Sequence, residues 1–326
     1  MLFGFRKVPP WFHNLATFLV AFGTTISAFW ILALNSWMQT PAGHEIVDGV
    51  VYAKSWLEII FNPSFPYRLA HMLLASGITA SFLITGVSAF GFLLKGKTPA
   101  IMAALKSGVF LAAILVPLQI FVGDLHGLNT LKHQPQKIAA MEGLWETTSA
   151  APLLLFAIPD EKNRTNNFEI KIPQLASLIL THDFNGELKG LNEFENHPPV
   201  APVFFAFRVM VGMGVLMLLI SWVAASNLIW KDNLNKFLAY ILVAMSFSGW
   251  IAVLAGWYVT EIGRQPWLIS GILKTADAVS SVPSQNILVS LMGYLLVYLF
   301  LLFAYVRTIF HMARKFNQVN YDSRSN

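Results

Sequence analysis

Six stretches of the sequence are almost continuously apolar, and each is long enough to cross a lipid bilayer. They cover about residues 15–34, 69–94, 101–123, 203–225, 237–260 and 287–306. A hydrocarbon core of roughly 30 Å requires about 20 apolar residues in an α-helix. A helix also satisfies its backbone polar groups internally, as lipid demands. The pattern therefore predicts an all-α integral membrane protein with six transmembrane helices.

One long polar segment, residues 124–201, separates the third stretch from the fourth. It contains an amphipathic piece, PQKIAAMEGLWET, followed by the turn-rich sequences IPD, NRTNN and IKIP. A structureless loop of this length is unusual unless it is functional. We therefore expect a single membrane domain over residues 1–326 with one long functional loop.

The distribution of Lys and Arg predicts the orientation of the chain. With a cytoplasmic N-terminus, the inner segments contain Arg6, Lys7, Lys95, Lys97, Lys106, Lys231, Lys236, Arg307, Arg314, Lys315 and Arg324. The short outer loops contain Lys54, Arg68, Arg264 and Lys274. This bias follows the positive-inside rule. Both termini are expected to be cytoplasmic, and the long loop extracytoplasmic.

Composition supports the membrane class and argues against two others. The chain is 56% hydrophobic and 12% charged, whereas soluble domains carry about 25% charged residues. Its net charge is +5, but no basic stripe is interleaved with aromatics, so we expect no nucleic-acid partner. The first apolar stretch runs into WMQTP rather than a small-residue cleavage site, so it is not read as a removable signal peptide.

Ionisable residues within the apolar stretches are functional candidates, because each costs roughly 2.5 to 3.5 kcal/mol at a helix centre. His71, Lys106, Arg208 and Glu261 form this set. Lys106 lies within two turns of the inner helix end, so its ammonium group is expected to reach the interface. His71 and Met210 could share one depth near the outer surface. They would then either ligate a haem iron from both sides or simply pack in the core.

The remaining candidates also allow two interpretations each. Arg208 could pair with a haem propionate or extend to lipid headgroups. Glu261 and Arg264, one turn apart, could form an i, i+3 ion pair beside Trp257, or a carboxylate ligand with its neutralising arginine. In the long loop, the group of Lys137, Glu142 and Asp124 could be solvated or could bind and deprotonate a quinol. His126 and His133 are a weak metal pair, since no further ligands accompany them.

Five ordered motifs resemble subunit I of the cytochrome bd quinol oxidases over essentially the whole chain. They are SAFWILALNSWMQTP (27–41), RLAHMLLASG (68–77), QKIAAMEGLWET (136–147), APVFFAFRVMVGMG (201–214) and GWYVTEIGRQPW (256–267). The short segment before HPPVAP resembles the cyanide-insensitive branch. The resemblance implies a multi-pass protein of the bacterial cytoplasmic membrane that oxidises quinol at the outer face.

The resemblance also implies roles for individual residues. His71 and Met210 would be the axial ligands of a low-spin haem b that Arg208 stabilises. Glu261 would ligate a high-spin haem b, with Trp257 and Arg264 nearby. Lys137, Glu142 and Asp124 would form the quinol site of the family's Q-loop, residues 124–201. Ser27 and Asn35 match polar positions of the first span, with a share in proton supply.

The family's first three transmembrane helices, with the haem d ligand, have no counterpart in the sequence. We expect another part of the subunit, or another polypeptide, to supply them. The assembly would then add subunit II and haem d, could include a small accessory subunit, and would pass electrons through the low-spin haem to a two-haem, oxygen-reducing centre. Two alternatives are a non-catalytic membrane scaffold and a quinol-oxidising cytochrome b that does not reduce oxygen.

Overall fold

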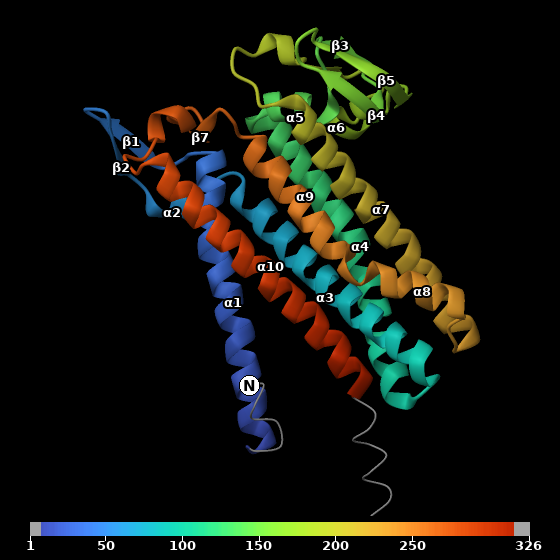
Figure 1. The fold of residues 1–326 in the computed structure, drawn as a ribbon. Helices are drawn as coiled ribbons and strands as arrows, with labels where there is room; N and C mark the ends of the chain where they lie inside the picture. The colour runs from blue at the N-terminus through green and yellow to red at the C-terminus, as the bar shows by residue number, and fades with distance from the viewer. Residues whose placement is uncertain (1–7, 316–326) are drawn as a thin grey trace, which may run out of the picture.

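The computed structural model describes residues 8–315 and contains six helices long and apolar enough to cross a membrane (Figure 1). They are α1 (Pro10–Gln39), α3 (Phe65–Lys95), α4 (Pro99–His133), α7 (Val200–Lys231), α8 and α9 together (Lys236–Ala244 and Ser248–Ile262) and α10 (Ser284–Lys315). A 3₁₀ turn, η2 (Met245–Phe247), joins α8 to α9. Each span contains one of the expected apolar stretches, so the predicted six-helix architecture is confirmed.

The helix α4 continues ten residues past its predicted end at residue 123. Asp124 and His126 therefore lie on a transmembrane helix and not at the start of a loop. The helix persists because no proline follows residue 123 until Pro135, which begins the next helix. Polar residues mark the membrane edge in a sequence, but they do not end a helix.

The packed core consists of α3, α4, α7 and the α8–α9 pair. Small residues allow close approach: a Cβ at Gly108 of α4 would lie 2.4 Å from Thr85 Oγ1 of α3. Such approach is typical of helix packing in lipid, where dispersion contacts replace the hydrophobic effect. These four elements hold the buried apolar side chains Phe82, Leu105, Val109, Met217 and Leu242.

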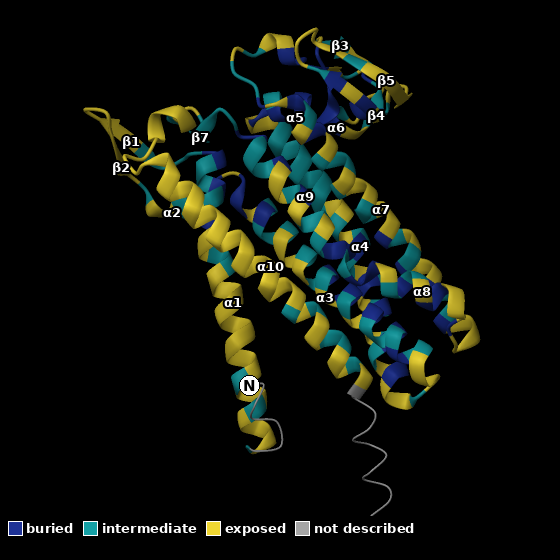
Figure 2. Ribbon diagram, viewed as in Figure 1, coloured by how far each residue is buried: buried dark blue, intermediate teal, exposed yellow. Residues whose placement is uncertain are grey.

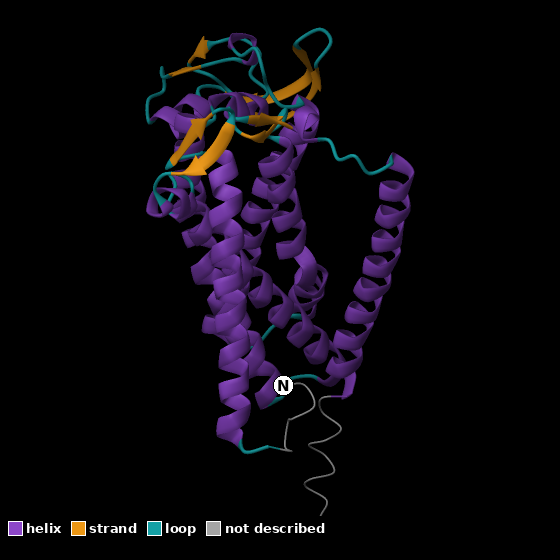
Figure 3. Cartoon of the chain, turned by 90° about the vertical axis from the view of Figure 1, so that its left-hand side faces the viewer, coloured by secondary structure: helices purple, strands orange, loops and turns teal. Residues whose placement is uncertain are grey.

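The helices α1 and α10 lie at the margin of this core and are largely exposed (Figure 2). The buried residues of α1 are Ala33, Ser36 and Gln39, all near its outer end. The outer part of α10 stands apart from the other helices in the view of Figure 3. Its inner part contacts the core, where Tyr305 stacks on Trp250 with ring centroids 5.4 Å apart. The two helices present apolar surface away from the core.

Short elements form a layer over one end of the bundle, opposite the start of α1 and the end of α10 (Figure 1). The helical ones are α2 (Trp56–Ile60), α5 (Pro135–Glu142), α6 (Leu175–Thr181), η1 (Leu191–Glu193) and η3 (Thr275–Ala278). The strands are β1 (His44–Val47), β2 (Val50–Ala53), β3 (Thr148–Ser149), β4 (Leu153–Asp160), β5 (Thr165–Ile172), β6 (Glu187–Leu188), β7 (Trp267–Ile269) and β8 (Leu273–Lys274).

The strands pair antiparallel as β1–β2, β3–β6, β4–β5 and β7–β8. The sequence pattern predicted the helices but not these ladders, because short strands between turns have little periodicity. The helix α5 lies beneath this layer and packs against α4 and α7. Its last six residues, 137–142, are all buried, which makes it the element that joins the loop to the membrane helices.

Candidate functional site

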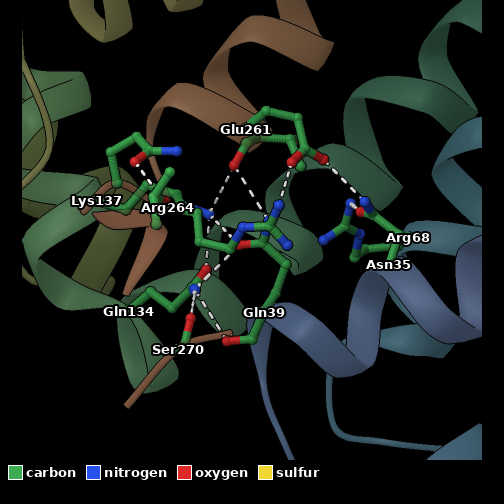
Figure 4. Close-up of polar contacts among 11 residues, drawn as sticks. Asn35, Gln39, Arg68, Gln134, Lys137, Glu261, Arg264 and Ser270 are labelled. Carbon is green, nitrogen blue, oxygen red and sulfur yellow. Dashed lines mark hydrogen bonds and ion pairs between the residues drawn. The ribbon is translucent and has the colours of Figure 1, made fainter. Parts of the chain in front are cut away.

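The carboxylate of Glu261 lies in a buried polar cluster at the end of the bundle that carries the loop layer (Figure 4). Glu261 occupies the last turn of α9. Its Oε1 accepts a hydrogen bond from Asn35 Nδ2 of α1 at 2.9 Å. Its Oε2 accepts one from Arg264 Nη2 at 2.5 Å. The expected i, i+3 ion pair is therefore formed, and both carboxylate oxygens are engaged.

Arg68 of α3 belongs to this cluster but was not among the predicted site residues. Its guanidinium is buried and donates to Asn35 Oδ1. Because arginine can only donate, this contact orients the Asn35 amide with its nitrogen toward Glu261. The sequence analysis counted Arg68 only as an outer-loop charge, yet its position three residues before His71 was a signal that it faces the same region.

Arg264 follows α9 and has donors without a partner. Its side chain is 6% exposed, and within the described residues Nε and Nη1 make no hydrogen bond. Burial lowers the pKa of Arg264, while Glu261 acts in the opposite direction. Unpaired buried donors are costly, so Arg264 is suited to hold an anionic group such as a carboxylate.

Lys137 of α5 reaches the same cluster but meets no carboxylate. Its Nζ donates to Gln39 Oε1 at 2.6 Å, to Gln134 Oε1 at 2.8 Å and to the carbonyl oxygen of Thr260 at 3.4 Å. Burial lowers the pKa of Lys137 well below its ordinary value, and the nearby charges of Arg68 and Arg264 act in the same direction. Neutral acceptors thus hold an amine that loses its proton readily.

Glu142, five residues later on α5, lies in a different environment. It accepts a hydrogen bond from Arg208 Nη2 of α7 at 3.0 Å. Arg208 also donates through Nη1 to the carbonyl oxygen of Met141 and through Nε to that of Leu154. Arg208 therefore clamps the loop to α7 and does not extend to the membrane surface. Burial raises the pKa of Glu142, and Arg208 offsets part of this rise.

His71 lies on α3 and faces α4. Its Nε2 is 3.0 Å from Gln119 Nε2, and its ring centroid is 5.7 Å from that of His126. Nδ1 is buried and has no hydrogen-bond partner within residues 8–315. A Cβ at Gly123 would lie 3.2 Å from His71 Cε1, so the ring rests on a helix surface that only glycine leaves open.

Met210 packs on the opposite side of the core, on α7. A Cβ at Gly256 of α9 would lie 2.9 Å from its sulfur. Among the described residues, no hydrogen bond, ion pair or ring contact brings Met210 to His71. Trp257 is 57% exposed and stacks on Tyr258, and Asp124 is half-buried on α4. These two side chains do not join the buried cluster.

The possible ligands are dispersed, which limits the kind of metal site. Within residues 8–315, no group of three or more His, Asp and Glu side chains could hold a metal ion. His133 is exposed at the end of α4, whereas His126 packs against His71. A haem iron needs only one or two protein ligands. His71, Met210 and Glu261 fit that need, and the unpaired donors of Arg264 fit a propionate.

Comparison with known proteins identifies the family. Residues 1–317 match the family model of cytochrome bd terminal oxidase subunit I. The chain is 34% identical to the cytochrome bd ubiquinol oxidase subunit 1 of Bacillus subtilis, over 94% of this chain and 70% of that protein. It is 31% identical to the cytochrome bd-II ubiquinol oxidase subunit 1 of Escherichia coli, over 96% of this chain and 74% of that protein.

The fold agrees with this similarity. The bd oxidase structure from Geobacillus thermodenitrificans superposes with a TM-score of 0.86 at 30% identity, covering 96% of this chain and 73% of that one. The residues matched by the family model include every membrane span and the loop layer that holds Lys137 and Glu142. On sequence and fold together, the chain is a multi-pass membrane protein that belongs to the cytochrome bd terminal oxidase subunit I family.

Proposed function

We propose that this chain, assembled with a subunit II, oxidises quinol at its outer face and holds two b-type haems of an oxygen-reducing quinol oxidase. Haem d belongs to the complete assembly. The observation that carries the proposal is the buried cluster of Figure 4, in which the loop residue Lys137 donates to the carbonyl oxygen of Thr260, one residue before the carboxylate of Glu261. The family similarity supports the reaction class.

Lys137 is the residue best suited to take a proton from quinol. Quinol oxidation requires a group that hydrogen-bonds the ring oxygen and accepts its proton. Burial lowers the pKa of Lys137, so its neutral form is accessible and can act as that base. Glu142 and Asp124 complete the proposed site, with Arg208 fixing Glu142 in place. Protons released here leave at the outer face, with both termini cytoplasmic.

His71 and Met210 would hold the low-spin haem b, and Glu261 would hold the high-spin haem b. A bound haem supplies one-electron transfer at its iron. In support, Nδ1 of His71 is buried and makes no hydrogen bond among the described residues, and the sulfur of Met210 lies against Gly256 of α9. Arg264 would hold an anionic group beside Glu261, and Arg208 and Trp257 would lie near the haems. Asn35 fixes the orientation of the Glu261 carboxylate.

A reduced-minus-oxidised absorption spectrum of the assembled oxidase tests the ligand assignment. His71→Ala and Met210→Ala should each abolish the low-spin haem b band. His133→Ala, at an exposed histidine, and Met213→Ala, on the same helix as Met210, should retain it. A full low-spin band in a folded His71→Ala or Met210→Ala oxidase would overturn the assignment. A colourless native assembly would instead support a non-catalytic scaffold.

A further inference from the structure

Gln39, the last residue of α1, connects three elements through one side chain. It is 2% exposed. Its Oε1 accepts hydrogen bonds from Lys137 Nζ at 2.6 Å and from Gln134 Nε2 at 3.1 Å. Its Nε2 donates to the carbonyl oxygen of Thr260 at 3.2 Å. Gln134 also donates to the main-chain oxygen of Gln39 and to Ser270 Oγ.

The contact with Thr260 has a specific structural reason. The helix α9 ends at Ile262, so the carbonyl of Thr260 is among the last four, which lack a partner within the helix. Gln39 supplies the missing donor one residue before Glu261. Gly263 then lets α5 approach this helix end, because a Cβ there would lie 3.0 Å from Lys137 Cγ and 2.3 Å from the Val259 oxygen.

We propose that Gln39 is a positioning residue that holds Lys137 at the quinol site and ties it to the helix turn that carries Glu261. This inference rests on the proposed function. An amide is suited to the task because it accepts and donates at the same time. One side chain thereby couples the place where quinol gives up its protons to the place where Glu261 is held.

Substitutions at Gln39 separate its hydrogen bond with Lys137 from its hydrogen bond with Thr260. Leucine removes both, whereas glutamate keeps an acceptor for Lys137 but loses the donor to Thr260. Gln136→Leu is the matched control, because Gln136 lines the same outer cavity of about 490 Å³ as Gln39, yet makes no hydrogen bond to Lys137 among the described contacts. All variants are made in the assembled oxidase.

Two measurements report on the two links. The first is the KM and kcat for a short-chain quinol, and the second is the midpoint potential of the high-spin haem b. In Gln39→Leu we expect KM to rise about tenfold, as for a buried donor left without its partner, and the potential to shift. In Gln39→Glu we expect a nearly native KM, because an acceptor for Lys137 remains, together with a shifted potential and a lower kcat, because the new carboxylate holds the proton on Lys137. Gln136→Leu should be native in both.

Native KM and potential in Gln39→Leu would overturn the inference, and so would equal KM values in the leucine and glutamate variants. If Gln39→Leu does not assemble, the split between KM and potential in Gln39→Glu decides. Lys137→Met, measured beside these variants, distinguishes a failure of the proposed quinol site from a failure of the proposed role of Gln39. A native KM in Lys137→Met overturns the quinol site itself. A raised KM there, with native values in Gln39→Leu, overturns only the role of Gln39.

Discussion

The two ends of α5 bury opposite charges in opposite ways. Glu142 is ion-paired with Arg208, whose other donors are taken up by loop carbonyls. Lys137 is equally buried, but among the described residues its ammonium group donates to two amides and one carbonyl rather than to a carboxylate. Five residues in an α-helix turn the side chain by about 140°, so the two residues face different neighbours. The helix α5 thus presents an ion-paired carboxylate to α7, and an amine held by neutral acceptors to α1 and α9.

This difference separates the residue proposed to accept the proton, Lys137, from the ion pair that holds the proposed site in place. A buried charge that loses its partner is strongly destabilising, so the Arg208–Glu142 pair is committed to holding the loop in place. A buried amine without a carboxylate partner gains little stability, but it keeps a lowered pKa and can exchange a proton. Substitutions of the Arg208–Glu142 pair and of Lys137 test this difference, and the largest expected effect comes first.

Arg208→Leu should cause the largest loss of stability. It leaves Glu142 buried without a partner and frees the carbonyls of Met141 and Leu154. The expected cost is about 3 to 5 kcal/mol, measured as the free energy of unfolding of the solubilised assembly. The double variant Arg208→Leu/Glu142→Leu should recover much of this loss. A cost below about 1 kcal/mol, typical of an exposed pair, would contradict the clamp.

The pH dependence of stability should have opposite signs on the two sides. Lys137 has a lowered pKa, so its contribution is present above its ordinary value and is lost as pH falls through the folded-state pKa. Between these values stability rises by up to about 1.4 kcal/mol per pH unit. Glu142 has a raised pKa, so its contribution is present below the ordinary value and is lost as pH rises through the folded-state pKa.

Variants assign these two slopes. Unfolding measured across pH should lose the alkaline slope in Lys137→Met and keep it in Lys132→Met, whose lysine is exposed. Glu142→Gln should lose the acid contribution while the alkaline slope persists. The same alkaline slope in native protein and in Lys137→Met would show that Lys137 keeps its ordinary pKa in the folded protein.

The smallest effect is expected at the exposed charges of the other membrane face. Asp232 pairs with Lys106 at 2.6 Å and Lys97 at 2.9 Å, in solvent. Hydrogen bonds from Lys106 and then Lys97 lower the pKa of Asp232 to about 2, so these pairs persist until strongly acid pH. Asp232→Asn should leave haem content, quinol turnover and melting temperature near native. A large loss of haem content, quinol turnover or melting temperature in Asp232→Asn would show that the charges of that face contribute to function or stability.

The membrane spans were predictable because hydropathy alone determines them. Lys106 was also predictable, and its ammonium group reaches Asp232 at the membrane edge as expected. The outer ladders were not predicted, since β3 and β6 are two residues long and the longer pair β4–β5 has register shifts that interrupt its alternation. The helix α4 extends ten residues beyond the predicted apolar stretch, because polarity marks the end of an apolar stretch and not the end of a helix.

Within the site, the sequence pointed to Asn35, Lys137, Glu261 and Arg264, but not to Gln39 or to the contacts that join these residues. Asn35 and Glu261 are 226 positions apart, and Gln39 and Lys137 are 98 apart. Such contacts depend on tertiary packing, which a single sequence does not encode as a local pattern. The different surroundings of Lys137 and Glu142, in contrast, follow from a local pattern. Their spacing of five residues places them on different faces of a helix.

Turnover of Lys137→Met in the assembled oxidase tests the central claim most directly. The account predicts that quinol oxidation falls by about 100-fold, as for loss of a general base, while the melting temperature and the low-spin haem b band remain native. Lys132→Met should retain full turnover. Native quinol oxidation by Lys137→Met would contradict the claim that the unpaired lysine of α5 serves the chemistry.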